Sequence, residues 1–303
     1  MPHPTEPNRQ LPRGDEIFLD HVGHFVPDRH AAARGLVRAG FAPTPVSVQV
    51  DSDGASTGAG NICAMLTRGY IELLFKTAET PLAAELDAAI ARYGGVHLVA
   101  FAVADAGKAH RRLGDASFPM RPLVELERPV EIASGRRKTA AFTVARVERG
   151  AMSEGRIQLL THHSEDAVWQ KRWLAHPNGA RGLASVVIVV KDVDEAAKRF
   201  ARFTGRRATA TKAGRTIQLD RGRVELVTRS AFRAALPEVD IPSMPFIGAY
   251  GVVVQSLETV ELMHDKVRLH TRRIGDVLMG LYPPPLEHGS WLFAENSEST
   301  PFR

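Results

Sequence analysis

The chain has 303 residues, of which 44% are hydrophobic and 24% charged, and its formal net charge is +5. This composition is ordinary for a globular protein, and the length accommodates one large domain or two of average size. The basic residues are scattered with few aromatic side chains between them, whereas a nucleic-acid groove needs a continuous basic face with stacking rings. We therefore expect no nucleic-acid partner, but a basic surface that attracts small anions.

The single cysteine, Cys63, excludes an internal disulfide and is typical of a reducing compartment. It falls in an expected strand, where a buried thiol is usually inert. Residues 1–13 are polar and lack the apolar core of a secretion signal, and no run of about 18 apolar residues could form a membrane span. We expect a cytoplasmic protein, monomeric or homodimeric, without a membrane partner.

In chain order, the first predicted unit is a strand within residues 19–28, a helix over residues 28–39, and strands at residues 46–50, 62–67 and 70–75. Asp28 is in the position of a helix N-cap. A Gly-, Ser- and Asp-rich turn region over residues 51–60 separates the first two of these later strands.

The same order of elements recurs three times, in units that open near residues 96, 183 and 246. Three of their closing strands share one pattern, a glycine followed two positions later by Ile or Val and then by Glu or Gln, and the fourth is a degraded copy. The glycines are Gly69, Gly155, Gly222 and, in a degraded copy, Gly289. A unit repeated in this way predicts a fold built from four βαβββ modules.

Two polar residues stand out in the first unit. Because side chains alternate between the faces of a strand, His21 shares a face with Gly23 and Phe25, and Glu72 shares a face with Leu74. If each strand packs its more apolar face on the helix, His21 and Glu72 point into the same hollow. An imidazole and a carboxylate in one hollow form part of a divalent-metal site or an acid–base pair.

These motifs resemble the vicinal oxygen chelate superfamily, and within it the glyoxalase-like domain proteins. The carriers are residues 19–28, the Gly-Tyr-Ile-Glu-Leu-Leu strand at residues 69–74, and the stretch from Thr161 to Ala180. The resemblance covers about residues 17–296. It implies an α+β fold in which four βαβββ modules pair into two glyoxalase-like domains, each closed into a cup. We place the domains at residues 15–165 and 183–298, with a linker at residues 166–182.

In that superfamily a divalent ion is held by residues on the first and fourth strands of each module. The resemblance carries this role to His21, Glu72 and Gln158 in the first pair of modules, while the fourth position falls on Leu98. His97 is one residue out of register and could substitute only if a β-bulge intervenes. In the second pair the positions cannot make a conventional site, so we expect a degenerate C-terminal cup. They are Ser185, Glu225, Ala249 and Leu292.

Three further histidines have two readings each. His162 shares the inward parity of Gln158, so it could be a ligand or general base at the cup rim, or cap the next turn. His176 precedes Pro-Asn-Gly, a turn sequence, and either stabilises this turn or forms a lid over the pocket. His24 lies on the opposite strand face from His21 and is expected to be a buried, hydrogen-bonded side chain; the other reading is a ligand, because glyoxalase-like proteins often have a His at this position.

The resemblance implies a metal-dependent enzyme of the lyase, isomerase or dioxygenase class that acts on a small oxygenated molecule in the N-terminal cup. Glu72 and His162 are the predicted acid–base residues. The ion would be Zn, Mn, Ni, Co or Fe, because mixed His, Glu and Gln ligands suit all of these. The alternative is a metal-free protein that binds or sequesters an organic ligand, and Leu98 at a ligand position favours it.

Overall fold

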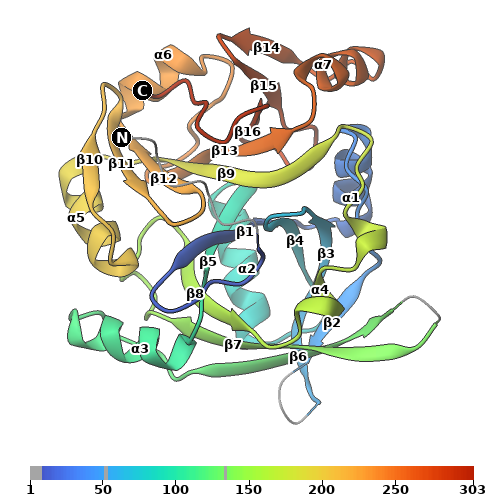
Figure 1. Cartoon of the computed structure of the whole chain (residues 1–303), viewed down its shortest axis with the longest axis vertical. Helices are drawn as coiled ribbons and strands as arrows, with labels where there is room; N and C mark the ends of the chain where they lie inside the picture. The colour runs from blue at the N-terminus through green and yellow to red at the C-terminus, as the bar shows by residue number, and fades with distance from the viewer. Residues whose placement is uncertain (1–8, 51–53, 133–134) are drawn as a thin grey trace.

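Four βαβββ units follow one another along the chain, as the sequence predicts (Figure 1). The computed structural model describes residues 9–50, 54–132 and 135–303. The first unit comprises β1 Ile17–Phe25, α1 Arg29–Arg38, β2 Ser47–Val50, β3 Ser56–Met65 and β4 Tyr70–Lys76. The second comprises β5 Gly95–Val103, α3 Ala106–Asp115, β6 Val124–Glu131, β7 Arg137–Arg146 and β8 Arg156–His162.

The third and fourth units repeat this order in the C-terminal half. The third comprises β9 Ala180–Val189, α5 Val193–Thr204, β10 Ala208–Ala210, β11 Gly214–Gln218 and β12 Arg223–Val227. The fourth comprises β13 Phe246–Val254, α7 Leu257–Lys266, β14 Thr271–Ile274, β15 Val277–Leu281 and β16 Ser290–Ala294. The units are connected by α2 Pro81–Arg92, by α4 Glu165–Val168 with the 3-10 turn η1 Lys171–Trp173, and by α6 Arg229–Ala235.

The expected turn over residues 51–60 is shorter than the sequence predicts. Strand β3 begins at Ser56 rather than near residue 62, because the hairpin with β4 extends to the pairs Ala59–Lys76 and Gly60–Phe75. Residues 51–53 of this turn, and residues 1–8 of the polar N-terminal segment, lie outside the described residues.

The first helix of every unit begins at a side-chain cap. The carboxylate of Asp28 accepts hydrogen bonds from the backbone N–H groups of His30 and Ala31, which have no partner inside the helix. The same position is taken by Asp105, Asp192 and Ser256 in the other units. Each cap stops the preceding strand and starts the helix at the same point of the module.

The strands of the N-terminal half close into a ring. Their order is β1-β4-β3-β2-β6-β7-β8-β5, and the ring is completed by antiparallel pairing of β5 with β1. The C-terminal strands have the order β10-β11-β12-β9-β13-β16-β15-β14, and in the described part of the chain β10 and β14 do not pair. One residue pair between β5 and β13 joins the halves in a continuous sheet, so the division at residues 15–165, 166–182 and 183–298 stays a prediction.

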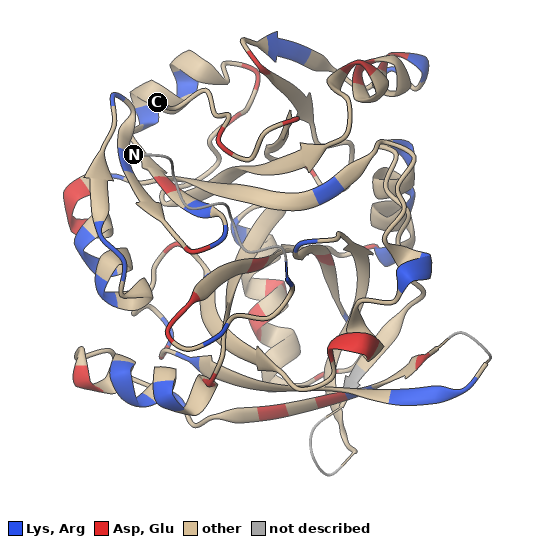
Figure 2. Cartoon of the chain, in the orientation of Figure 1, with Lys and Arg blue, Asp and Glu red and all other residues tan. Residues whose placement is uncertain are grey.

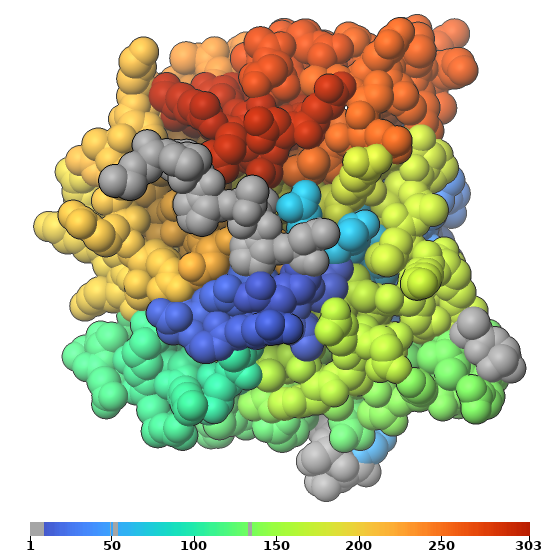
Figure 3. Space-filling model, in the orientation of Figure 1, coloured from blue at the N-terminus to red at the C-terminus, as the bar shows by residue number. Residues whose placement is uncertain are grey.

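The inside of the N-terminal ring has its own apolar cluster, and α2 contributes to it. Leu86 of α2 packs with Phe25, Leu74 and Leu98, which project inward from β1, β4 and β5. The outer faces of the strands pack on α1, α3, α5 and α7 in a larger core. The space-filling view shows the N-terminal half, coloured blue to green, in broad contact with the yellow-to-red C-terminal half (Figure 3).

Charged residues of both signs are interspersed over both halves, in agreement with the scattered basic residues of the sequence (Figure 2). Within the described ranges, no helix combines the length and the apolar character needed to cross a membrane.

The repeated glycine before each closing strand has a physical explanation. At Gly69 the backbone has a φ of +81°, and a Cβ would lie 2.5 Å from the carbonyl oxygen of Asp20. Gly150 has a similar φ of +83° but nothing within 4 Å of a Cβ. Gly150 is not one of the repeated glycines, and of this pair only Gly69 combines a left-handed backbone with a close approach of another strand.

We predict that Gly69→Ala lowers the free energy of unfolding by roughly 3 kcal/mol, because it adds a backbone clash to the left-handed strain. Gly150→Ala carries only the strain and should lose roughly 1 kcal/mol. Urea denaturation of both variants measures the difference. Equal losses would mean that the approach of Asp20 does not constrain this turn.

Candidate active site

A β-bulge in β1 places two consecutive polar side chains inside the cup. Leu19 pairs with Phe101 and His21 with Ala100, so Asp20 is an extra residue without a partner position on β5. Strict alternation would turn Asp20 away from His21, but the bulge interrupts the alternation. Leu19 and Val22 remain in the outer core, while Asp20 and His21 both face inward.

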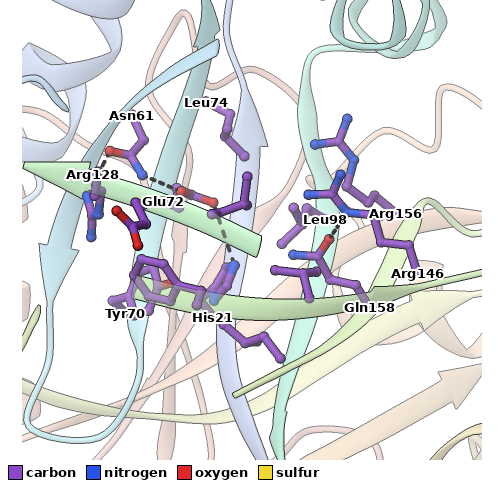
Figure 4. Close-up of a pocket in the computed structure, with 15 residues that line it drawn as sticks. His21, Asn61, Tyr70, Glu72, Leu74, Leu98, Arg128, Arg146, Arg156 and Gln158 are labelled. Atoms are coloured by element: carbon purple, nitrogen blue, oxygen red, sulfur yellow. Dashed lines mark hydrogen bonds and ion pairs between the residues drawn. The ribbon is translucent and has the colours of Figure 1, made fainter. Parts of the chain in front are cut away.

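His21 and Glu72 face each other, as the sequence predicts (Figure 4). His21 Nε2 lies 3.6 Å from Glu72 Oε2, which is longer than a hydrogen bond. The imidazole stacks on the Tyr70 ring with the centroids 4.3 Å apart. On the other side of the carboxylate, Asn61 Nδ2 donates to Glu72 Oε1 at 2.6 Å, and Arg128 Nη1 donates to Asn61 Oδ1 at 3.0 Å. We call His21 and Glu72 the dyad.

Asp20 lies between two imidazoles. Its carboxylate is 2.7 Å from His21 Nδ1 and 3.0 Å from His162 Nε2. An ionised carboxylate only accepts hydrogen bonds, so both of these ring nitrogens donate. In neutral His21 the remaining nitrogen, Nε2, then carries its lone pair toward Glu72. Burial alone would raise the pKa of Asp20, but His162 and His21 outweigh it and hold the pKa well below its ordinary value.

The dyad lines a small pocket of about 50 Å³ inside the cup. The opposite wall carries Gln158, Arg146 and Arg156 around Leu98 (Figure 4). Gln158 Oε1 accepts a hydrogen bond of 3.0 Å from Arg146 Nε. The pocket therefore has a carboxylate and an imidazole on one side and two guanidinium groups on the other.

The described side chains do not supply the ligand set that a catalytic metal centre ordinarily has. Such a centre takes three protein ligands and leaves one position open. His21 and Glu72 offer two, but the oxygen of Gln158 is engaged by Arg146, and the fourth position is the apolar Leu98. Among the described residues, no three His, Cys, Asp or Glu side chains lie close enough together to hold an ion.

The prediction that His162 lies at the cup rim is wrong. It has the inward parity expected, but the segment after β8 folds over it, and its side chain is fully buried. The ring packs edge-on against Trp169 at 4.7 Å and Phe142 at 5.1 Å. His162 thus reaches Asp20 and does not line the pocket, so it cannot contact a substrate there.

His97 lies on a β-bulge, and such a bulge is the condition under which it could replace the missing ligand. Gly23 pairs with Leu98 and His24 with Val96, so His97 is the extra residue on β5. Nevertheless its Nε2 lies 2.7 Å from the carbonyl oxygen of Tyr93, and the ring faces a second cleft rather than the pocket. Burial, followed by the Arg92 and Arg156 charges, lowers the pKa of His97 to about 4. The prediction that His97 could replace the missing metal ligand is therefore wrong.

His176 stabilises a turn and is not a lid. Its Nδ1 accepts from the N–H of Ala42 at 2.9 Å, and its Nε2 donates to the carbonyl oxygen of Met65 at 2.7 Å. Both ring nitrogens are thereby used by the backbone. His24 is buried against Tyr250 at 3.0 Å, as expected, and burial raises the pKa of the Cys63 thiol to about 12, in keeping with an inert cysteine.

The C-terminal segment of the chain covers part of the second cup and leaves a pocket of about 100 Å³ beside Glu225. Glu225 corresponds to Glu72, but it is paired with Arg223 and accepts a hydrogen bond of 2.7 Å from Thr300. Phe302 packs into the apolar cluster of this half, stacked on Phe232 with the centroids 6.0 Å apart. The neighbouring positions Ala249 and Leu292 are apolar and buried. The second cup thus lacks the ligand positions of the first, and its remaining pocket is partly covered by the C-terminal segment.

Sequence reasoning missed four residues that shape the first pocket. They are Asp20, Asn61, Arg128 and Arg146. For Arg128 the signal was available, because a polar side chain inside a strand needs a partner. Asn61 lies just before the strand predicted at residues 62–67, so no strand face could be assigned to it. Asp20 was hidden by the bulge, which has no local sequence signature.

The comparisons with known proteins agree with this fold. A family model described as the glyoxalase-like domain matches residues 19–204. Two solved structures similar in fold are a hypothetical protein from Staphylococcus aureus (TM-score 0.63, 9% identity, covering 91% of this chain and 98% of that chain) and a mutant of 4-hydroxymandelate synthase from Streptomyces coelicolor (TM-score 0.56, 12% identity, 92% of each). At these identities the similarity is one of fold alone. No curated protein matches the sequence.

We predict that Asp20→Asn lowers the free energy of unfolding at pH 7 by roughly 3 kcal/mol, because it removes a buried charge paired with two imidazoles. The folded-state pKa of Asp20 lies below its unfolded value of 3.8. Its contribution is therefore complete above about pH 4 and is lost as the pH falls further. Denaturation experiments from pH 7 to pH 3 should show that the difference in the free energy of unfolding between wild type and variant becomes smaller.

The matched control is Asp87→Asn, which breaks an exposed ion pair with Lys76 and should cost no more than about 1 kcal/mol. A gap for Asp20→Asn that is as small as that of the control would contradict the role given to Asp20.

Proposed function

Because the chain belongs to the family of glyoxalase-like domain proteins, whose fold is that of the vicinal oxygen chelate superfamily, we propose that its N-terminal cup is an enzyme active site. The reaction is a proton transfer on a small oxygenated molecule. The observation that carries this proposal is the dyad, in which His21 Nε2 and Glu72 Oε2 face one pocket 3.6 Å apart.

The surroundings of the dyad suit acid–base chemistry. Asp20 holds the proton of His21 on Nδ1, which leaves Nε2 as the basic atom directed at the pocket. Asn61 fixes one oxygen of Glu72 at 2.6 Å and leaves the other free. A base oriented by a third group is a recurring arrangement in enzymes. One member of the dyad can then remove a proton from a substrate carbon and the other can return it.

The opposite wall supports the same chemistry. Removal of a proton next to a carbonyl places negative charge on the carbonyl oxygen. Fixed cations near that oxygen stabilise this charge in the transition state. Arg146 and Arg156 lie on the wall facing the dyad, so they are placed to supply such cations without moving.

A divalent ion, which the resemblance implies, is not needed for this proposal. His21 and Glu72 would be two of its ligands, and a bound ion would act as a Lewis acid on a substrate oxygen. Gln158 is engaged by Arg146, and the apolar Leu98 takes the fourth position. The proposed proton transfer therefore uses only the side chains of the chain itself.

The second candidate function is binding or sequestration of an organic anion without conversion. The guanidinium groups around Leu98 favour it, because arginine recognises carboxylate and phosphate groups through paired hydrogen bonds. Both candidates place the ligand in the same cup, and they differ in whether Glu72 and His21 perform chemistry.

The first test is exchange of a carbon-bound proton with solvent. We expect the wild type, in deuterated water, to exchange the α-proton of at least one member of a panel of 2-oxo and 2-hydroxy acids, as followed by proton NMR. Glu72→Gln should lower the rate by about 100-fold or more, because it removes a general acid–base group. The control is Glu125→Gln, which should leave the rate unchanged, because Glu125 is an exposed residue of β6 that does not line the pocket.

If no member of the panel exchanges its proton although ligands still bind, the result would contradict the enzyme proposal and favour binding without conversion. Equal rates for Glu72→Gln and wild type would remove Glu72 from the mechanism.

The second test concerns the ion. We expect Mn²⁺, Co²⁺, Ni²⁺, Zn²⁺ and anaerobic Fe²⁺ to shift the Tm of the wild type no further than that of His21→Ala, since the cup lacks a third ligand. A ligand that binds only the folded state at 100 times its Kd adds about 2.7 kcal/mol of stability. An ion that raises the Tm by several degrees in the wild type but not in His21→Ala would support a metal-dependent enzyme.

A further inference from the structure

A second cleft lies beside the pocket, between α2, the end of β7 and the loop that leads into β8. Its volume is about 330 Å³, against about 50 Å³ for the pocket. Arg146 and Arg156 line both, so the two hollows meet at these side chains. The charged residues of the cleft are five arginines and two glutamates: Arg92, Arg121, Arg146, Arg149, Arg156, Glu85 and Glu148.

One carboxylate serves three of the arginines. Glu85 of α2 lies 3.3 Å from Arg121 Nη1, 2.6 Å from Arg149 Nη2 and 3.3 Å from Arg156 Nη2. The Glu85 side chain is only 14% exposed. A single negative charge cannot balance three guanidinium groups, so the cleft retains positive charge around Glu85.

Arg146 has no acidic partner. Among the residues that the structure describes, no carboxylate oxygen is paired with its guanidinium, and its Nε donates to the neutral amide of Gln158 at 3.0 Å. Burial, together with the charges of Arg156 and Arg121, lowers the pKa of Arg146 to about 9. Because arginine stays protonated in proteins, Arg146 is a partly buried cation without a paired carboxylate in the described part of the chain, and other cations lie nearby.

Two arginines of the cleft are held in place before any ligand arrives. Arg156 is 13% exposed, and its guanidinium lies 5.0 Å from the centre of the Phe25 ring. Arg92 is held by neutral oxygens, with its Nε donating to Ser243 Oγ at 3.0 Å. Arginines that are already fixed lose little conformational entropy when they bind an anion.

We propose that this cleft binds an oxyanion group with two or more negative charges, either a phosphate or two neighbouring carboxylates, through Arg146, Arg149 and Arg156. Balancing uncompensated buried cations supplies the driving force, and the planar guanidinium groups match the oxygen geometry. The inference goes beyond the dyad, because neither His21 nor Glu72 lines this cleft.

The position of the cleft also indicates the substrate class. The pocket has room for only a few atoms, whereas the adjoining cleft is several times larger. An anionic group held in the cleft would anchor a molecule whose reactive end enters the pocket past Arg146 and Arg156. This last step rests on the proposed function, while binding of the anion itself does not.

The test is calorimetric titration with inorganic phosphate, pyrophosphate and citrate, with acetate as a monoanion, all at matched ionic strength. We expect the wild type to bind at least one polyanion 10-fold or more tightly than acetate. The double variant Arg146→Gln/Arg156→Gln should lose at least 10-fold in affinity. The control Arg111→Gln/Arg233→Gln, which removes two exposed arginines elsewhere, should bind as the wild type does.

Phosphate or pyrophosphate binding without citrate binding would identify a phosphate group, and the reverse would identify carboxylates. Binding of all anions with the same affinity, or unchanged affinity in the double variant, would overturn the proposal. If the double variant does not fold, Arg149→Gln takes its place, because Arg149 is 65% exposed, and a loss of less than 3-fold would then count against the site.

Two further measurements separate this inference from the proposed function and from a structural role. Glu72→Gln should keep the polyanion affinity within 2-fold even if it abolishes proton exchange, so the two proposals can fail independently. Arg146→Gln should leave the Tm unchanged or raise it, because it relieves repulsion between cations. A large fall in Tm would show instead that Arg146 serves to stabilise the fold.

Discussion

The arrangement of the N-terminal pocket depends on one buried carboxylate, that of Asp20, which accepts hydrogen bonds from His21 and His162. The carboxylate carries no solvent-exposed surface, so its charge must be balanced by these two rings. In balancing it they become fixed themselves. His21 is turned with Nε2 toward Glu72, and His162 is held beneath Trp169. The bulge in β1 is therefore what orients the dyad.

The closed ring of the N-terminal half gives the dyad its enclosure. Pairing of β5 with β1 brings the second module's strands opposite the first module's, and α2 packs Leu86 on the cluster inside. Polar groups enclosed in this way interact more strongly than in water. The C-terminal half has the same modules without ring closure, and Thr300 and Phe302 cover part of its hollow. Duplicated modules have thus produced one accessible cup and one cup that is partly covered.

Charge is distributed unevenly within the accessible cup. One side has the acceptors Glu72 and Asp20, each satisfied by neutral or imidazole donors. The other side has guanidinium groups that share too few carboxylates, with Glu85 serving three of them. Excess positive charge of this kind disfavours the folded state. Its presence beside the dyad is understandable if an anionic ligand balances it.

The four modules, the capped helices and the facing of His21 and Glu72 followed from the sequence. These features depend on local rules: alternation along a strand, an Asp or Ser before a helix, and a glycine at a left-handed turn. Asp28 and Gly69 can be recognised from such patterns without knowing what lies nearby. The inert Cys63 and the buried His24 were also within reach, since each sits in an apolar strand.

Only the tertiary structure decided the rest. The bulges at Asp20 and His97 arise from the register between β1 and β5, which are separated by some 70 residues of chain, and no local pattern encodes that register. The same pairing turned Asp20 inward and still left His97 on the carbonyl of Tyr93. The arginine cleft is assembled from α2, β7 and β8. The sequence by itself determined which side chains each strand offers to the cup, and the packing of distant strands determined which of them meet.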